Sequence, residues 1–276
     1  QEAEIPSERL RAVLVPRGSG DAAASPPSPE EQRRRVLAAL DHPIGAPPLE
    51  VLAQGRRTAT VLVSDHTRPV PSALTLPLLL ERLRRGSPAL DITILVATGC
   101  HRGMTARERR AKFGDALCDA ERIVVHDCGD ADSLRPLGTL PSGGALWLNR
   151  LALETDLLVA EGFIEPHFFA GFSGGRKSVL PGVAGRRTVL ANHCAAFIAD
   201  PRARAGVLDG NPIHRDMLHA ADQARLAFIL NVTLLPDKRI AAAFAGAHAP
   251  AHRAGCAWMR EAARVPAVRA GIVIAG

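Results

Sequence analysis

From about residue 57 onward, short apolar runs alternate with longer amphipathic segments, and this alternation constrains the fold more than any other feature. The apolar runs are rich in β-branched residues and have the length of buried strands; they occupy residues 59–63, 92–97, 123–125, 145–148, 157–160, 228–235 and 240–245. Helical patterns occupy residues 75–85, 189–198, 213–220 and 251–263, and a further helix begins at about residue 105. The sequence therefore predicts an α/β fold that is Rossmann-like and doubly wound around a mostly parallel sheet.

Composition divides the chain into three regions. Residues 1–56 are rich in Pro, Ser and Ala around positions 21–29, and we expect an N-terminal arm with a short helix that ends near Leu40. Residues 57–270 contain the alternating pattern and make up the predicted α/β domain. Residues 271–276 form another strand-like apolar run, and we expect them to begin a second, smaller α/β domain that is truncated or absent.

Charge and composition argue against several classes of protein. The formal net charge is +6, from 34 Lys and Arg against 28 Asp and Glu, but acids and bases alternate along the predicted helices. Aromatic residues make up only 4% of the chain, so a stacking platform for nucleic acid is not expected. The sequence holds no apolar run long enough to span a membrane, and its five cysteines lack CxxC spacing. We expect reduced thiols and a cytoplasmic protein without nucleic-acid or membrane partners.

Residues 161–182 form a Gly-rich segment that concentrates the residue types of a reactive site. The segment follows the predicted strand at 157–160, and open α/β sheets bind ligands at the carboxyl ends of their strands. Gly171, Gly174 and Gly175 permit close approach of the backbone to a ligand, while His167 and Lys177 supply an imidazole and an amine. His193 follows in the next predicted helix and can return a second imidazole to the same pocket.

A motif within this segment invites a different interpretation. Residues 171–178, GFSGGRKS, differ from the P-loop pattern GxxxxGK[ST] at Arg176, where the pattern requires Gly. A P-loop also leaves its strand directly, whereas about ten residues intervene here. A P-loop-like nucleotidase is therefore kept only as an alternative.

Two earlier strand ends carry further polar side chains. Residues 64–69 include Arg68, which can bind a carboxylate or phosphate with two hydrogen bonds, and Asp65, which can orient a neighbour. The same residues suit an ordinary turn and helix cap equally well. Residues 97–103 place His101 in a Gly-rich turn, where a single imidazole is usually structural. Three imidazoles, an Arg and a Lys at one predicted sheet edge nevertheless indicate a site.

Five segments together resemble the nickel-dependent lactate racemase family. They are SDHTRP at 64–69, ATGCHR at 97–102, PHFFAGFSGGRKSVLPG at 166–182, NH at 192–193 and GNPIH at 210–214, in order and with family-like spacing. Independent short motifs rarely align by chance, so the set is more specific than any of its members. The resemblance implies that residues 57–270 are a cofactor-binding catalytic domain.

The resemblance further implies a cofactor, the nickel-pincer nucleotide, which is a Ni(II) pyridinium-3,5-bisthiocarboxylic acid mononucleotide. Lys177 would carry it covalently through a thioamide bond, and His193 would be the protein ligand to nickel. Soft sulfur donors with one imidazole suit square-planar Ni(II). The other implied cofactor-binding residues are Thr98, Gly99, Gly174 and Gly175.

The activity implied by the resemblance is racemisation or epimerisation of a lactate-like 2-hydroxy acid. Arg68, with Asp65 beside it, would bind the substrate carboxylate, and His101 and His167 would be the paired acid and base. Transfer of the α-hydrogen as hydride to the cofactor would give a planar 2-keto acid, which avoids a carbanion next to a carboxylate. The implied partners are the substrate and the enzymes that make the cofactor, with a homodimer as one option for assembly.

The sequence differs from the family pattern at two points. Family members continue into a second domain, which lies beyond Gly276, and His66 stands where an apolar residue is usual, so it is a candidate for biasing substrate choice. A non-catalytic module that binds a nucleotide or anion through Arg68, Lys177 and the Gly-rich loop remains an alternative.

Overall fold

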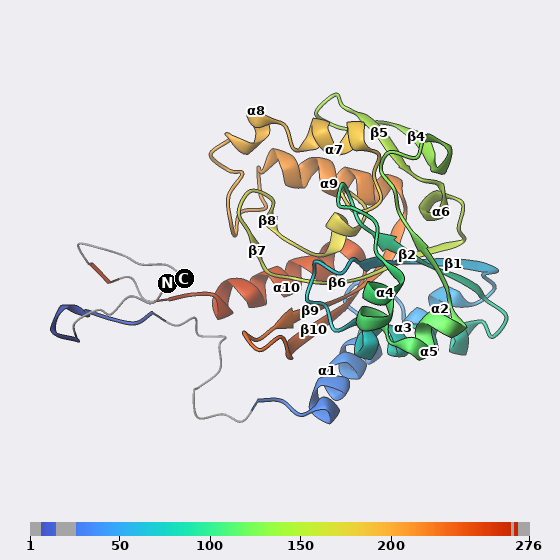
Figure 1. Ribbon diagram of the computed structural model, residues 1–276, viewed down its shortest axis with the longest axis horizontal. Coiled ribbons are helices and arrows are strands. Elements are labelled where there is room, and N and C mark those ends of the chain that lie inside the picture. The colour runs from blue at the N-terminus through green and yellow to red at the C-terminus, as the bar shows by residue number, and fades with distance from the viewer. Residues whose placement is uncertain (1–6, 15–25, 266–267, 270–276) are drawn as a thin grey trace.

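A six-stranded sheet forms the centre of the chain (Figure 1), for which the computed structural model describes residues 7–14, 26–265 and 268–269. The strand order is β10–β9–β6–β1–β2–β3, and β10 is antiparallel to β9 while the other neighbouring pairs are parallel. The strands are β1 (Thr58–Ser64), β2 (Asp91–Ala97), β3 (Arg122–Val125), β6 (Leu157–Phe163), β9 (Leu226–Leu234) and β10 (Ile240–Gly246). The predicted α/β class with a mostly parallel sheet is confirmed.

The central strands are buried on both faces, which explains their continuous apolar runs. In β1, Val61 and Val63 belong to one hydrophobic core and Leu62 to a second, and all three side chains are fully buried. In β2, Ile94 and Leu95 divide between the two cores in the same way. A parallel sheet of this kind needs a layer of helices on each face.

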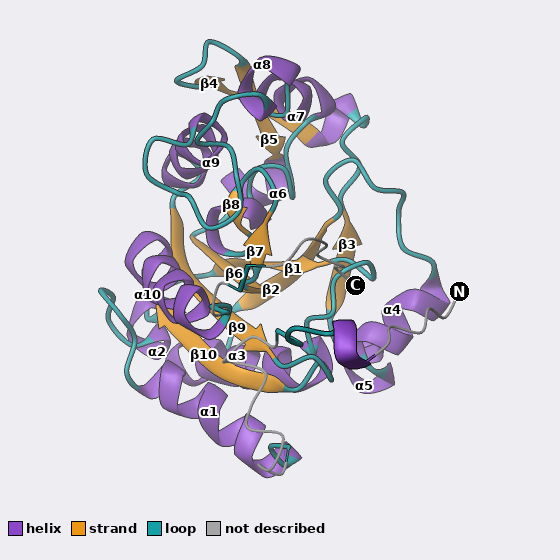
Figure 2. Cartoon of the chain, turned by 90° about the vertical axis from the view of Figure 1, so that its left-hand side faces the viewer, coloured by secondary structure: helices purple, strands orange, loops and turns teal. Residues whose placement is uncertain are grey.

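Two sets of helices supply these layers (Figure 2). The first hydrophobic core is covered by α1 (Pro29–Asp41), α2 (Leu49–Ala53), α3 (Ser72–Gly86), α4 (Ala106–Phe113) and α5 (Asp115–Ala120). The second is covered by α6 (Arg150–Leu153), α7 (Arg186–Asn192), α8 (Ala195–Ile198), α9 (Pro212–Gln223) and α10 (His248–Ala262). The fold is therefore doubly wound. Short 3-10 helices occupy Ser7–Arg9 (η1), Ala131–Ser133 (η3) and Gly175–Ser178 (η4).

The helical part of the predicted N-terminal arm belongs to the main core. Val36 and Leu40 of α1 are fully buried in the first core, and Arg35 donates hydrogen bonds to the carbonyl oxygens of Ile240 and Ala241 at 2.8 and 2.7 Å. Helix α1 thereby covers the antiparallel edge strand β10. A boundary at residue 56 does not separate an arm from a core, because α1 and α2 bury their apolar positions in it. The predicted truncated domain, 271–276, lies outside the described residues.

Two further differences from the sequence prediction concern the second half of the chain. Strand β5 (Ala145–Asn149) pairs with β4 (Leu134–Thr139) in a separate two-stranded sheet instead of joining the main one. The sequence did not reveal β4, since Pro136 and Gly138 interrupt its pattern. The single helix expected at 189–198 is two helices, α7 and α8, and His193 lies at the break.

The chain order of the strands creates a crevice between β1 and β6. Strand β1 is followed by β2 on one side of it, whereas the chain leaving β6 goes on to β9 on the other side. Ligands of doubly wound sheets bind at such a switch point, outside the carboxyl ends of the strands. Within the described part of the chain, no helix combines the length and apolar character needed to cross a membrane.

Candidate active site

A cleft of about 350 Å³ lies at this switch point, at the carboxyl ends of β1, β2 and β6. Nine of the residues predicted for the site line it: Asp65, Arg68, Thr98, Gly99, His101, His167, Gly174, Lys177 and His193. Eight of them come from three loops that are far apart in the sequence and that the parallel sheet brings together at one edge, and His193 comes from the end of α7. The remaining predicted residue, Gly175, does not line the cleft; its N–H donates to Oδ1 of Asn231 at 2.7 Å and holds the loop from behind.

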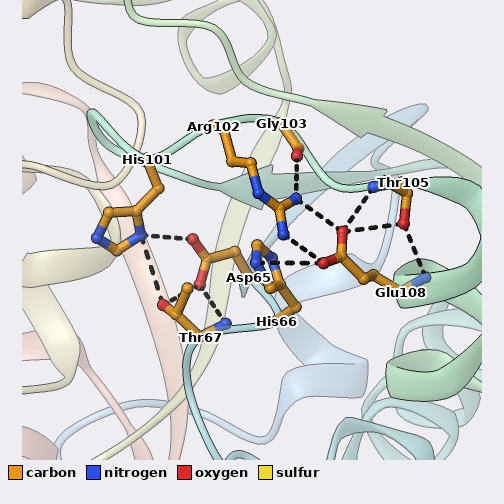
Figure 3. Close-up of polar contacts among 8 residues, drawn as sticks. All are labelled: Asp65, His66, Thr67, His101, Arg102, Gly103, Thr105 and Glu108. Carbon is orange, nitrogen blue, oxygen red and sulfur yellow. Dashed lines mark hydrogen bonds and ion pairs between the residues drawn. The ribbon is translucent and has the colours of Figure 1, made fainter.

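Asp65 and His101 form a tightly bonded pair on one wall of the cleft (Figure 3). Nδ1 of His101 lies 2.6 Å from Oδ2 of Asp65, whose other oxygen accepts hydrogen bonds from the backbone N–H and the hydroxyl of Thr67 at 2.9 and 2.6 Å. Burial raises the pKa of Asp65, but the bonds from Thr67 and His101 outweigh it, so that the pKa lies below its ordinary value. Asp65 is therefore a carboxylate that orients an exposed imidazole, and its side chain is not free for a substrate.

A second network beside this pair binds the two loops together. Glu108, in the first turn of α4, accepts hydrogen bonds from the guanidinium of Arg102 and the backbone N–H of Thr105, and lies 3.5 Å from Nε2 of His66 (Figure 3). His66 faces Glu108 and is not among the residues that line the cleft, so the structure does not support a direct effect of His66 on substrate choice. Its contact ties the β1 loop to the β2 loop instead.

Lys177 projects from η4 into the cleft, with its amine 5.9 Å from the centre of the Phe169 ring. Burial, helped by the charges of Arg176 and Arg68, lowers the pKa of Lys177 to about 7. A substantial fraction of the amine is then uncharged near neutral pH. An uncharged amine is a nucleophile, so this lysine is suited to covalent attachment of a ligand.

His167 and His193 line the same cleft and share one aromatic neighbour. The Phe169 ring packs edge-on against both, with centroid distances of 4.6 Å to His167 and 5.1 Å to His193. Burial, followed by the charge of Lys177, lowers the pKa of His167 to about 3 and that of His193 to about 4. Both imidazoles are consequently neutral at physiological pH, which is the form that binds metals and accepts protons.

His193 lies at the end of a helix and keeps a ring nitrogen without a partner among the described residues. The residue is the C-cap of α7 and its backbone N–H donates to the carbonyl of Val189 at 2.8 Å. Its Nδ1 is buried and has no hydrogen-bond partner in the described part of the chain. Among those same residues, no three His, Cys, Asp or Glu side chains are grouped so as to hold a metal ion.

Thr98 and Gly99 shape the cleft through their backbone. The Thr98 hydroxyl is used internally, since it donates to the carbonyl of His126 at 2.7 Å. Gly99 has a φ of +57° and donates its N–H to the carbonyl of Gly182 at 2.9 Å, which joins the β2 loop to the Gly-rich loop. A side chain at Gly99 would be strained by this φ.

Arg176 is the main determinant of the Gly-rich loop, and the sequence suggested only that it breaks a P-loop pattern. The residue is 1% exposed, and its guanidinium donates to the carbonyls of Ala170 and Gly174 at 2.8 and 3.1 Å, and to Nδ1 of His214 at 3.0 Å. It also contacts Nε2 of His252 at 2.9 Å. The charge is thus solvated by carbonyls and imidazoles of the protein, and the loop folds around it.

Two other charged residues that support the site were not predicted. Lys112 of α4 donates to the carbonyls of Arg68 and Val70 at 2.9 and 3.3 Å and so fixes the loop that carries Arg68. Glu161 of β6 is fully buried, which raises its pKa, and accepts hydrogen bonds from Ser72 and Thr75. Glu161 had a sequence signal, a carboxylate inside an apolar strand, whereas Lys112 looked like any lysine on a solvated helix.

The sheet and its cleft define a doubly wound α/β protein with a cleft at the switch point, lined by a lysine and three imidazoles. A family model described as the lactate racemase N-terminal domain matches residues 1–206, and the chain belongs to this family. The chain is 51% identical over 271 residues to a lactate racemase from Thermoanaerobacterium thermosaccharolyticum, and 50% identical over 243 residues to one from Lactiplantibacillus plantarum. These matches cover 98% and 88% of the chain but only 62% and 57% of the relatives.

Solved structures agree with this assignment. The lactate racemase apoprotein from T. thermosaccharolyticum superposes with a TM-score of 0.88 at 50% identity, over 95% of this chain and 60% of that one. A Thermotoga maritima protein gives a TM-score of 0.66 at 22% identity, over 85% of this chain and 59% of that one, which shows a shared fold. The chain thus spans about 60% of the length of the relatives that it matches.

Proposed function

We propose that the chain is the cofactor-binding part of an isomerase that racemises or epimerises a lactate-like 2-hydroxy acid. The observation that carries the proposal is the convergence of His101, held by Asp65, with His167, Lys177, His193 and Arg68 around one cleft. The names of the curated relatives, both lactate racemases, support the same reaction.

The residues present fit a nickel-pincer nucleotide. His193 has a buried Nδ1 without a hydrogen-bond partner among the described residues, so a ring nitrogen is free for a metal, and Lys177 offers an amine whose pKa is lowered to about 7. When bound, such a group would accept the α-hydrogen of the substrate together with its electron pair. The cofactor itself would contribute the remaining, sulfur-containing donors to nickel.

The other residues bind the substrate and move its hydroxyl proton. Arg68 lies exposed at the rim of the cleft, and its planar guanidinium can hold a carboxylate by two hydrogen bonds. His101 and His167 lie on separate loops of the cleft, so each can serve the hydroxyl group of one enantiomer. Loss of the α-hydrogen and the hydroxyl proton leaves a planar 2-keto acid, whose reduction on the other face inverts the configuration.

The setting of the reaction follows from the same proposal. All five cysteines are free thiols, which suits the reducing cytoplasm. The partners would be the enzymes that make the cofactor. The part of the relatives that extends beyond the matched region would close over the cleft and exclude water from the reaction.

Coexpression with the enzymes that make the cofactor provides the test. The natural full-length protein is purified and its intact mass, its nickel content and its action on D- and L-2-hydroxy acids are measured, with chiral separation of the products. We expect a nucleotide mass on the peptide that contains Lys177, nickel in an amount equal to the protein, and racemisation of at least one acid. Lys177→Arg, which keeps a cation but cannot form the thioamide, is the control and should show no added mass.

A protein that keeps its unmodified mass under these conditions contradicts the proposal. Retention of a nucleotide or anion without nickel and without racemisation would instead favour a non-catalytic binding module that uses Arg68 and Lys177 as fixed charges. Binding of Mg-ATP that disappears in Lys177→Ala would favour a P-loop-like nucleotidase.

A further inference from the structure

The two candidate proton-transfer histidines have opposite kinds of partner at Nδ1. For His101 the partner is Oδ2 of Asp65, 2.6 Å away. An ionised carboxylate can only accept hydrogen bonds, and the pKa of Asp65 is lowered by the bonds from Thr67 and His101 against the effect of burial. In the neutral ring of His101 the proton is therefore on Nδ1, which leaves the lone pair on Nε2.

The partners of His167 are donors. The backbone N–H groups of Phe169 and Ala170 point at Nδ1 of His167 at 3.5 and 3.3 Å. A backbone N–H can only donate, so Nδ1 keeps its lone pair and the proton of the neutral ring is on Nε2. The ring is held in this orientation by Phe168, which stacks on it at 4.8 Å with an interplanar angle of 10°, and by the edge of Phe169.

The surroundings keep the His167 ring neutral. The cationic groups that act on it are Lys177, Arg176 and Arg68, and no carboxylate among the described residues counters them at Nδ1. A second proton on Nδ1 would also point at the hydrogens of the two backbone N–H groups, which is repulsive. A neutral ring with its proton on Nε2 is the one state that satisfies all of these contacts.

We propose that His101 and His167 hold opposite tautomers in the resting protein, so that His101 offers a proton-accepting Nε2 to the cleft and His167 a proton-donating Nε2–H. The assignment stands on hydrogen-bond geometry, and the charges around the two rings support it. Its catalytic meaning rests on the proposed function.

Opposite tautomers make the two histidines unequal at the start of a reaction. When His101 is the base, the O–H bond of the substrate breaks, its proton forms a bond to Nε2, and the resulting imidazolium is paired with Asp65. The α-hydrogen leaves with its electron pair to the two-electron acceptor that the proposed cofactor supplies, and a C=O bond forms. No rearrangement of the protein is needed.

His167 cannot accept a proton at Nε2 in its resting state, because that atom already carries one. To act as the base it has to move its proton to Nδ1, which displaces the N–H groups of Phe169 and Ala170 and opens the turn at 168–170. Until then it is a hydrogen-bond donor to an anionic oxygen of the ligand. Opening of the turn at 168–170 is therefore required before His167 can take the hydroxyl proton of the substrate.

Nitrogen NMR of the imidazole rings tests the assignment directly. The protein is labelled with ¹⁵N-histidine and studied without cofactor or substrate, and the two rings are assigned from His101→Gln and His167→Gln. We expect a protonated Nδ1 and a bare Nε2 in His101, and the reverse in His167. The same tautomer in both rings, or a protonated Nδ1 in His167, overturns the proposal.

A pair of variants checks the cause of the asymmetry. Asp65→Asn replaces the carboxylate and should shift the His101 ring away from the Nδ1–H form, while leaving His167 unchanged. Asp132→Asn, at an exposed carboxylate outside the cleft, is the matched control and should shift neither ring. An unchanged His101 spectrum in Asp65→Asn would mean that Asp65 does not set the tautomer.

The first turnover of the loaded enzyme supplies an independent readout. Because the two enantiomers of a racemised acid are equal in energy, kcat/KM is the same in both directions, so the asymmetry is measured most directly before the steady state. In the first turnover we expect one enantiomer to form 2-keto acid at least about tenfold faster than the other. The slower enantiomer is the one whose hydroxyl proton goes to His167, because the turn at 168–170 must open first. Equal first-turnover rates would contradict gating by this turn. A protein with the expected tautomers but no racemisation would refute the proposed function alone.

Discussion

Asp65 and His101 are 36 residues apart in the chain, yet Oδ2 of the one lies 2.6 Å from Nδ1 of the other. The register of the sheet explains the contact, because Ser64 at the end of β1 is paired with Ala97 at the end of β2. The first residue after β1 therefore faces the first turn after β2. A carboxylate that is 1% exposed can hold the ring of its partner without being open to solvent itself.

The first prediction concerns Asp65→Asn. An amide cannot stabilise the imidazolium that forms when His101 takes a proton, so we expect racemisation by the loaded enzyme to fall by about 10² to 10⁴, the usual contribution of general acid–base catalysis. Chiral separation of the products measures the rate. Nickel content and melting temperature serve as controls and should stay near those of the unchanged protein. Loss of nickel in this variant would show that Asp65 supports the cofactor and not the base.

The second prediction concerns His193→Ala. His193 is the proposed protein ligand to nickel and touches neither Asp65 nor His101 in the hydrogen-bond network, so its removal should abolish stable nickel binding. We expect the nucleotide mass at Lys177 to persist, because the covalent bond does not need the imidazole. Metal analysis and intact mass report the two results separately. His101→Ala is the matched comparison: metal loss there, with full metal retention in His193→Ala, would reverse the assignment.

The third prediction concerns Arg176→Lys. A lysine keeps the charge but cannot reach the carbonyls of Ala170 and Gly174 and the ring of His214 together, so the variant leaves buried acceptors without donors. We expect the free energy of unfolding to fall by ~3 kcal/mol in denaturant titrations. Arg253→Lys, on the exposed side of α10, should change it by less than about 0.5 kcal/mol. Similar effects of the two substitutions would show that Arg176 does not organise the loop.

The fourth prediction is a loss of stability in mild acid. Burial, with Arg176 next to it, lowers the pKa of His214 to about 3, and burial with Lys177 lowers that of His193 to about 4, from an ordinary value of 6.5. Between pH 6.5 and about 4 the unfolded chain therefore binds more protons than the folded one. The free energy of unfolding must then decrease as the pH falls through this window.

Melting curves of the cofactor-free protein between pH 7 and 4 check this slope. The carboxylates with lowered pKa values, such as Asp65, lose their contribution only at lower pH, so the two effects separate. His214→Asn removes one titrating group but keeps an acceptor for Arg176, and should flatten the slope. A melting temperature that is constant over this range would show that the histidines titrate normally in the folded protein.

The sequence by itself determined the fold class and the location of the site. The spacing of apolar residues that marks strands and helices is a local property of the sequence. A strand buried on both faces must be apolar throughout, and a doubly wound sheet places its ligand-binding loops at the carboxyl ends of its strands. That logic located Asp65, Arg68, His101, His167 and Lys177 on one edge, and all of them line the cleft. The distinctive run at 166–182 added the family, which the family model confirms.

Tertiary structure alone decided how these residues are supported. Arg176 was visible only as a mismatch to a motif, because nothing local tells a buried guanidinium from an exposed one; the carbonyls and histidines that solvate it come from the loop itself, α9 and α10. Lys112 fixes the Arg68 loop from a helix whose sequence is that of a solvated surface. The tautomer of each candidate proton-transfer imidazole likewise depends on whether an acceptor or a donor meets its Nδ1. The contacts of Arg176 with the two histidines, of Lys112 with the Arg68 loop and of His101 with Asp65 join segments that are tens of residues apart, and their geometry exists only once the sheet has aligned its strands.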